Sequence, residues 1–210
     1  MDEIGYFELD RVRLAGQDWG AFAGFLACVN APERISHYLA AAMPHLWPSR
    51  EVGVGERLSG LARASYMLWL ASPVVGRQTM QRLPAFVRTM IVRGAAADNR
   101  EGLYSAGDLA VFTEQWAEPE RAAATVRVYR TFLGRELPAL TRGDFAGVRM
   151  EQPAILLLGE EDPVVRPKAL LGDVPDAPNL EVRILPGVGH WIQEEAPEQM
   201  LAAMEELFSR

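Results

Sequence analysis

The chain has 210 residues, of which 49% are hydrophobic, and this length allows one compact domain or one domain that carries a large insertion. Its formal net charge of -7 argues against a nucleic-acid-binding protein, and its single cysteine, Cys28, excludes a disulfide framework or a thiolate metal site. The sequence has no apolar run long enough to span a bilayer and no visible signal peptide, which together with the lone cysteine predicts a cytoplasmic protein.

The first part of the chain, residues 1–44, alternates between strand and helix patterns. The short apolar and β-branched run from Val12 to Ala15 predicts a buried strand. From Gly20 to Val29 apolar residues fall nearly all round, which is typical of a helix packed beneath a sheet. A second strand is predicted over Ile35 to Ala42.

Residues 45–148 have a different character. Their pattern is helical, they are rich in large apolar and aromatic side chains, and we find no convincing strand among them. Three prolines, Pro73, Pro84 and Pro119, are expected to mark boundaries between helices. Asp108 is expected to be the N-cap of a helix that begins at Leu109.

Strand patterns return in the last part, residues 149–210. Strands are predicted over residues 153–159 and 180–185, with a short helix after Pro167 and an amphipathic helix over residues 196–207. Strands that alternate with helices imply a parallel sheet with right-handed crossovers, so the expected fold class is α/β.

The segment Gly16-Gln17-Asp18-Trp19-Gly20 has the layout of a nucleophile elbow, with aspartate where an esterase carries serine. Gly16 and Gly20 are expected to let the strand and the helix approach closely. The turn would lift Asp18 out at the carboxyl end of its strand, where a carboxylate can attack a saturated carbon and form an ester. The same Gly-x-Asp-x-Gly pattern also occurs in ordinary turns.

Two further loops follow predicted strands and carry Asp162 and His190. With Asp18 they lie at one edge of the predicted sheet, in the order nucleophile, acid, histidine. Glu160 or Glu161 is an alternative acid, but Asp162 is preferred because Asp-Pro-Val fixes the turn. Taken singly, Asp162 could be a turn residue and His190 a surface histidine. A metal site built from such residues lacks a recognisable ligand spacing.

These segments closely resemble the epoxide hydrolases of the α/β-hydrolase superfamily, to which haloalkane dehalogenases are related. The resemblance rests on residues 16–20, 159–164 and 189–198, and on two helical segments that look like the family's lid-tyrosine segments, 65–70 and 126–130. It implies an α/β-hydrolase fold with about four strands here and helices on both faces. The core would comprise residues 1–44 and 149–210, and residues 45–148 would form a helical lid.

The resemblance also implies roles for individual residues. Asp18 would be the nucleophile, His190 would activate water, Asp162 would orient His190, and Tyr66 and Tyr129 would activate the epoxide oxygen, unless these tyrosines only pack in the lid core. The N–H group of Trp19 would hold the oxyanion. The substrate pocket would include Trp19 and Trp191, and also Trp47, Met67 and Trp69, for which core packing is the favoured alternative. The substrates would be a small apolar epoxide and water, without a metal or an organic cofactor.

The sequence departs from the family pattern before Asp18. Family members carry about four strands there and a His-Gly-x-Pro turn that supplies part of the oxyanion hole, whereas only seventeen residues precede Asp18 here. We therefore expect a chain that corresponds to the carboxyl-terminal part of such an enzyme. Its nucleophile strand would be an exposed sheet edge that invites pairing with another chain, as in a homodimer.

Three functional hypotheses follow from the sequence. The first is an epoxide hydrolase, and the second is a haloalkane dehalogenase that uses the same nucleophile. The third is a catalytically inactive protein of this fold that binds or dimerises. A serine esterase is disfavoured because no Gly-x-Ser-x-Gly motif occurs.

Overall fold

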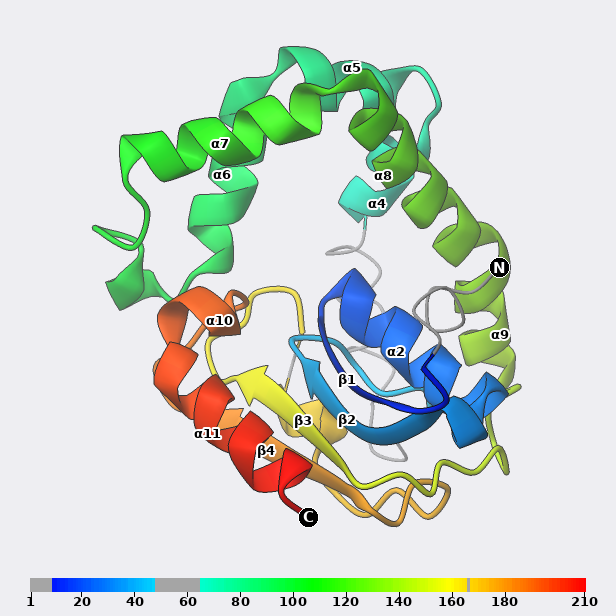
Figure 1. Ribbon diagram of the computed structural model, residues 1–210. Coiled ribbons are helices and arrows are strands. Elements are labelled where there is room, and N and C mark those ends of the chain that lie inside the picture. The colour runs from blue at the N-terminus through cyan, green and yellow to red at the C-terminus, as the bar shows by residue number, and fades with distance from the viewer. Residues whose placement is uncertain (1–8, 48–64, 166) are drawn as a thin grey trace. The chain divides into compact units, whose positions relative to one another are not determined.

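The computed structural model describes residues 9–47, 65–165 and 167–210 (Figure 1). The chain forms two compact units, residues 1–48 with 145–210 and residues 49–144. Residues 45–47 and 145–148 belong to the first unit, although the sequence pattern assigned them to the helical insertion. Part of that expected insertion, residues 48–64, lies outside the described residues.

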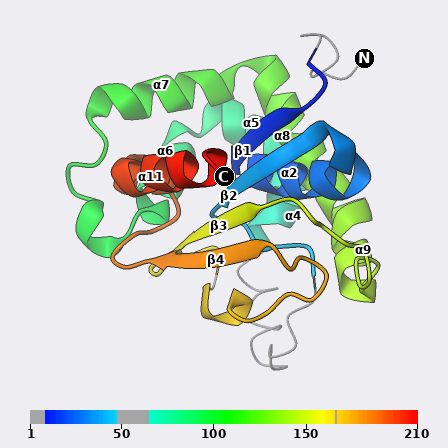
Figure 2. The same ribbon diagram turned by 60° about the horizontal axis from the view of Figure 1, so that its bottom comes forward.

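The first unit is built on a parallel sheet with the strand order β1-β2-β3-β4 (Figure 2). This confirms the predicted α/β class with four parallel strands. Each predicted strand and long helix is present, with boundaries shifted by one or two residues, and the short helix α10 was not predicted. The elements of this unit are β1 (Val12–Gln17), α2 (Trp19–Asn30), a 3-10 turn (Pro32–Arg34), β2 (Ile35–Ala41), β3 (Ala154–Gly159), a 3-10 turn (Pro167–Leu170), β4 (Leu180–Leu185), α10 (Ile192–Glu195) and α11 (Pro197–Phe208).

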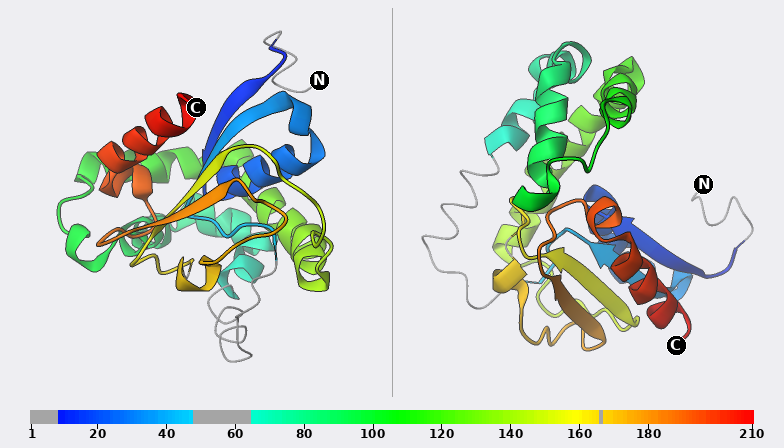
Figure 3. Two further views of the ribbon diagram at one scale, coloured as in Figure 1. Left: turned by 90° about the horizontal axis from the view of Figure 1, so that it is seen from below. Right: turned by 90° about the vertical axis from the view of Figure 1, so that its left-hand side faces the viewer.

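Helices cover both faces of this sheet, as can be followed in Figure 3. Leu39 of β2 and Ile155 of β3 belong to one buried cluster with Leu207 of α11. Tyr38 has the opposite parity on β2, so it points to the other face, where its ring packs edge-on against Phe25 of α2. All six residues of β3 are buried, as expected of a central strand in a parallel sheet.

The strand β1 stands at one end of the strand order, where its only partner among the described strands is β2. In β1 residues of intermediate burial alternate with exposed ones as far as Ala15, in contrast to the fully buried β3. The predicted pairing of this edge with another chain stays a prediction.

The second unit is helical throughout its described residues. Pro84 and Pro119 each begin a helix, and Pro73 lies just before one, in agreement with the sequence analysis. The elements are α4 (Ser65–Ala71), α5 (Val75–Arg82), α6 (Pro84–Gly94), a 3-10 turn (Ala97–Asn99), α7 (Ala106–Ala117), α8 (Pro119–Thr131), a π turn (Phe132–Glu136) and α9 (Leu137–Arg142).

The expected N-cap at Asp108 is wrong. Ser105 is the N-cap of α7, and its side chain accepts a hydrogen bond from the Asp108 N–H at 3.1 Å. The Asp108 carboxylate accepts in return from the Ser105 N–H at 2.8 Å, which makes a capping box with Asp108 at the third helical position. The sequence reading therefore placed the start of this helix three residues too late.

Within the ranges that the structure describes, none of the helices combines the length and the apolar character needed to cross a membrane.

Candidate active site

Asp18 occupies the turn between β1 and α2 in a backbone conformation that is rare for a residue with a side chain. Its φ is 50° and its ψ is -121°. Two backbone hydrogen bonds fix the turn: the Asp18 N–H donates to the Ala41 carbonyl at 3.0 Å, and the Phe22 N–H donates to the Asp18 carbonyl at 3.0 Å. Such strain persists only where the surroundings enforce it, and it is concentrated at functional sites.

The two glycines of the elbow have different roles. A Cβ atom at Gly16 would lie 2.6 Å from backbone atoms of Gly20, so only glycine allows this approach of strand to helix. A Cβ atom at Gly20 would meet no atom of the described residues within 4 Å. The expectation that both positions need a small side chain is therefore wrong for Gly20, which contributes its backbone rather than its missing side chain to the contact.

The structure brings Asp18, Asp162 and His190 together at the carboxyl ends of β1, β3 and β4. The Nδ1 atom of His190 lies 2.8 Å from Oδ2 of Asp162, and its Nε2 atom lies 3.6 Å from Oδ1 of Asp18. The His190 and Asp162 side chains are almost fully buried, whereas a third of the Asp18 side chain is exposed. Of the two carboxylates, the one at Asp18 is therefore open to an incoming ligand.

Asp162 is held rigidly as the partner of His190. Its second oxygen, Oδ1, accepts hydrogen bonds from the N–H groups of Val164 at 2.6 Å and Val165 at 2.9 Å. These bonds leave Oδ2 directed at the imidazole. The alternative acids Glu160 and Glu161 are both exposed, and the carboxylate on Nδ1 of His190 belongs to Asp162.

The charges around His190 favour the protonated imidazole. Burial lowers the pKa of this histidine, but hydrogen bonds and charge interactions with Asp162 and Asp18 outweigh burial and raise the pKa to about 10. His37 and His45, the other two histidines, have their pKa values lowered, mainly by burial. His190 is therefore the one histidine of the chain that two carboxylates keep charged near neutral pH.

Two side chains that sequence reasoning missed bind the backbone around His190. The amide Nε2 of Gln17 donates to the His190 carbonyl at 2.9 Å. The carboxylate of Glu195 accepts from the N–H groups of Gly189 at 2.9 Å and Trp191 at 3.1 Å. Both residues lie inside segments that carried the family resemblance, but no sequence pattern signalled these partners.

The aromatic residues of the first unit that were predicted to line the pocket fall into two groups, one next to Asp18 and His190 and one in the core. Trp19 and Trp191 are half-buried next to Asp18 and His190, and the ring of Trp191 packs edge-on against the imidazole at a centroid distance of 4.9 Å. Trp47 is buried against Phe25, and its indole N–H donates to the Val148 carbonyl at 2.8 Å. This bond also explains why residues around 47 and 148 join the first unit.

The two predicted lid tyrosines contact each other within the second unit. Tyr66 of α4 and Tyr129 of α8 pack edge-to-face, with ring centroids 6.0 Å apart and an interplanar angle of 78°. Met67 is half-buried beside Tyr66 in sequence. Trp69 is 54% exposed, and its indole N–H donates to Oγ1 of Thr79 at 2.7 Å.

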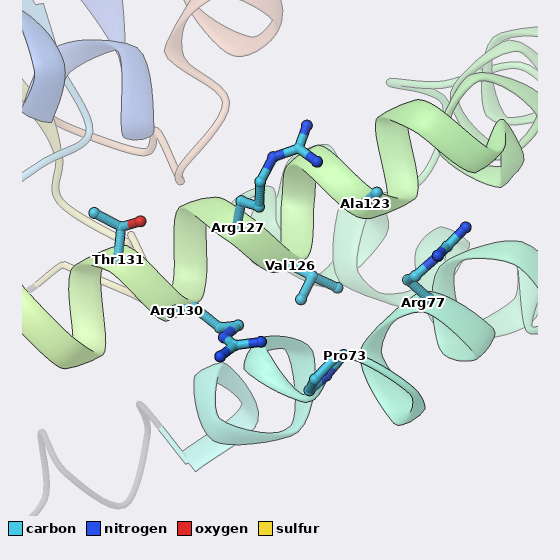
Figure 4. Close-up of a pocket in the computed structure, with 7 residues that line it drawn as sticks. All are labelled: Pro73, Arg77, Ala123, Val126, Arg127, Arg130 and Thr131. Atoms are coloured by element: carbon cyan, nitrogen blue, oxygen red, sulfur yellow. The ribbon is translucent and has the colours of Figure 1, made fainter.

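The second unit also contains an open pocket of about 350 Å³ between α8 and the turn before α5 (Figure 4). Its apolar wall includes Val126 and Pro73, and three exposed arginines, Arg77, Arg127 and Arg130, surround that wall. None of the predicted site residues lines it. Its cationic lining makes it a poor match for a small apolar epoxide.

Comparisons with known proteins relate the chain to both enzyme classes suggested by the sequence. The chain is 23% identical over 208 residues to Epoxide hydrolase 2 of Caenorhabditis elegans, a match that covers 98% of this chain and 57% of that protein. It is 26% identical over 213 residues to Haloalkane dehalogenase 2 of Mycobacterium tuberculosis, covering 98% and 67%. The chain thus spans between about half and two thirds of the length of these relatives.

Solved structures share the fold. A mutant of an epoxide hydrolase from Bacillus megaterium, complexed with its diol product, superposes with a TM-score of 0.80 at 21% identity and covers 99% of this chain and 72% of that one. An epoxide hydrolase mutant from Vigna radiata gives 0.77 at 20% identity, with 98% and 72% covered. A model of the alpha/beta hydrolase family matches residues 2–203, and the chain belongs to that family.

Proposed function

We propose that this protein is a hydrolase that opens an epoxide to a vicinal diol through a covalent ester on Asp18. The observation that supports this most strongly is the arrangement at the elbow: a partly exposed carboxylate in a strained turn, 3.6 Å from an imidazole that a buried carboxylate holds. The relatives named as epoxide hydrolases support the choice of substrate class.

In the first step, a carboxylate oxygen of Asp18 attacks the less hindered carbon of the epoxide. A new C–O bond forms, the strained C–O bond of the ring breaks, and its electron pair remains on the epoxide oxygen. Tyr66 and Tyr129 donate hydrogen bonds to that oxygen, and one of them gives it a proton. The product of this step is a hydroxyalkyl ester of Asp18.

In the second step, water cleaves the ester. His190 takes a proton from water, and the water oxygen attacks the carboxyl carbon of Asp18. The bond from that carbon to the alkyl oxygen breaks, and the alkoxide takes the proton back from His190 to complete the diol. Asp162 stabilises the imidazolium that exists between these two transfers. Asp18 is left as a carboxylic acid, and its proton passes to His190, which restores the starting carboxylate and imidazolium.

The electrostatics of His190 suit this order of steps. While Asp18 is ionised, it helps to keep the imidazole protonated. Esterification removes the negative charge of Asp18, so the pKa of His190 falls and the imidazolium releases its proton to solvent. The tyrosinate left by the first step recovers a proton from solvent, and the neutral imidazole can then act as the base. Trp19 is the first residue of α2, and backbone N–H groups at a helix start favour an oxyanion on the former carboxyl group.

Haloalkane dehalogenation is the second candidate, because a relative with this name matches almost the whole chain and Trp19 lies directly after Asp18. An indole N–H beside the nucleophile can stabilise a departing halide. The edge-to-face pair of Tyr66 and Tyr129 favours the epoxide, because a halide leaves without needing a proton. Epoxide opening therefore remains the preferred proposal.

The purified chain should convert styrene oxide to its diol and should release no halide from 1-bromobutane. The Asp18→Asn variant should form no diol, because a neutral amide is a poor nucleophile for a saturated carbon. Halide release without diol formation would select the dehalogenase. The absence of both products from the folded chain would contradict the proposal for this chain.

A further inference from the structure

The peptide group that joins His190 to Trp191 is held at both ends by side chains from other elements. Gln17, the last residue of β1, donates through Nε2 to the His190 carbonyl at 2.9 Å. Glu195, the last residue of α10, accepts through Oε1 from the Trp191 N–H at 3.1 Å. Through Oε2 it also accepts from the Gly189 N–H at 2.9 Å, so the loop is bound on both sides of the histidine.

The same loop is pressed against the end of β3. A Cβ atom at Gly159 would lie 2.0 Å from the Gly189 carbonyl oxygen, so the two backbones are in direct contact. The Glu161 N–H also donates to the Val188 carbonyl at 2.9 Å. These backbone contacts fix the distance between the loop and β3. The side chain of Gln17 adds a hydrogen bond between the loop and β1, and the side chain of Glu195 adds one to the peptide group that follows His190.

We propose that Gln17 and Glu195 are positioning residues for the hydrolytic half of the reaction, which keep the imidazole of His190 between Asp18 and Asp162. The proposal rests on the proposed function. Gln17 directly precedes Asp18, so its bond to His190 ties the base to the nucleophile across 173 residues. A shift of the loop would change the distance from His190 to the ester without moving Asp18 itself.

The different requirements of the two reaction steps distinguish a positioning role from a merely structural one. Ester formation needs Asp18 and the epoxide, whereas ester hydrolysis also needs the base at His190. Loss of a positioning contact should therefore slow hydrolysis and leave ester formation unchanged, so that the ester accumulates. A general loss of packing would lower both rates together, because it reduces the fraction of folded protein.

The chain offers a matched control for each residue. Gln152 is a buried glutamine of the same unit, and its Nε2 donates to the carbonyls of Cys28 at 3.0 Å and Pro32 at 3.3 Å, so neither of these bonds involves the histidine loop. Glu194 precedes Glu195 on α10, and its Oε2 atom is buried and accepts no hydrogen bond from the described residues. Gln17→Met pairs with Gln152→Met, and Glu195→Gln pairs with Glu194→Gln.

The test follows the ester on the Asp18 peptide by mass spectrometry after the chain is mixed with styrene oxide and quenched in acid. In Gln17→Met and Glu195→Gln we expect hydrolysis to slow roughly 10²-fold, the size expected for a small misplacement of a catalytic group, with ester formation at the wild-type rate. Both control variants should hydrolyse the ester like the wild type. Wild-type hydrolysis in the two test variants, or equal slowing in their controls, would overturn the proposal.

If no ester forms even in the His190→Gln variant, the proposed function itself is refuted. The positioning role of Gln17 and Glu195 is then tested separately by an NMR titration of His190. Burial lowers the pKa of His190, but its hydrogen bonds to Asp162 and Asp18 and the charges of these carboxylates raise it to about 10. This pKa should fall in Gln17→Met and Glu195→Gln and stay unchanged in the controls. An unchanged pKa in both test variants would then overturn the positioning role independently of any turnover.

Discussion

His190 contacts its two carboxylates unequally. Its Nδ1 atom makes a full hydrogen bond of 2.8 Å to Asp162, whereas the 3.6 Å between its Nε2 atom and Asp18 exceeds the usual range for such a bond. The contact with Asp18 is therefore the looser of the two, and it raises the pKa of His190 through a long hydrogen bond and through charge. The imidazole can keep its orientation through Asp162 while the charge of Asp18 changes during a reaction.

Neutralising Asp18 should lower the pKa of His190. In Asp18→Asn one of the two carboxylates that raise this pKa is lost, while the bond to Asp162 remains, so the pKa should fall below its wild-type value of about 10. The measurement is an NMR titration of the three histidines, in which His37 and His45 serve as internal references. A wild-type pKa in the variant would show that Asp18 does not act on His190.

Because His190 is protonated in the folded protein, the free energy of unfolding should decrease as the pH rises into the alkaline range. Because the folded pKa of about 10 lies above the ordinary value of 6.5, the stabilisation is fully present below about pH 6.5 and is lost as the pH rises to 10. The loss amounts to at most about 1.4 kcal/mol per pH unit. Urea unfolding of the wild type and of His190→Gln should therefore differ in slope between these pH values, and parallel curves would contradict the assigned pKa.

The two glycines of the elbow should respond oppositely to alanine. In Gly16→Ala the new methyl group would lie 2.6 Å from the Gly20 backbone, and overpacking of this kind costs about 1–3 kcal/mol of unfolding free energy. In Gly20→Ala the methyl group meets no atom of the described part of the chain within 4 Å, and alanine favours the helix by about 0.5–1 kcal/mol. Chemical denaturation measures both, and equal destabilisation would contradict the described packing.

Removing the hydroxyl group of either lid tyrosine should slow the first step and spare the second. Tyr66→Phe and Tyr129→Phe each remove a proposed donor to the epoxide oxygen, so ester formation should slow by about 10²-fold while ester hydrolysis keeps its rate. Tyr104→Phe is a suitable control, because Tyr104 belongs to another edge-to-face aromatic pair of the same unit. Single-turnover kinetics with styrene oxide measure both steps, and wild-type ester formation in both test variants would exclude the proposed tyrosine role.

Much of the fold was predictable because local patterns of apolar and polar residues determine its strands and helices. The apolar run of β3 and the alternation of β4 identified strands that the structure contains at nearly the same residues. The Gly-x-Asp-x-Gly segment identified the turn at Asp18 because few sequences tolerate the close approach at Gly16. The order of strands and loops then sufficed to expect Asp18, Asp162 and His190 at one sheet edge.

What the sequence did not reveal depends on partners far away in the chain. The bond from Gln17 to His190 spans 173 residues, and the bond from Trp47 to Val148 spans 101 residues. No local periodicity reports such pairs, so Gln17 went unnoticed and Trp47 was placed in the helical insertion. The capping box at Ser105 was overlooked for a different reason: aspartate is common both at the N-cap and at the third helical position.

The covalent intermediate is tested most directly by trapping it. The His190→Gln variant retains Asp18 but lacks the proposed base for ester cleavage, so incubation with styrene oxide should add the mass of one epoxide molecule to the peptide that contains Asp18. The double variant with Asp18→Asn should gain no such mass. An unmodified Asp18 peptide from a folded His190→Gln variant, under conditions in which the wild type forms diol, would contradict the account.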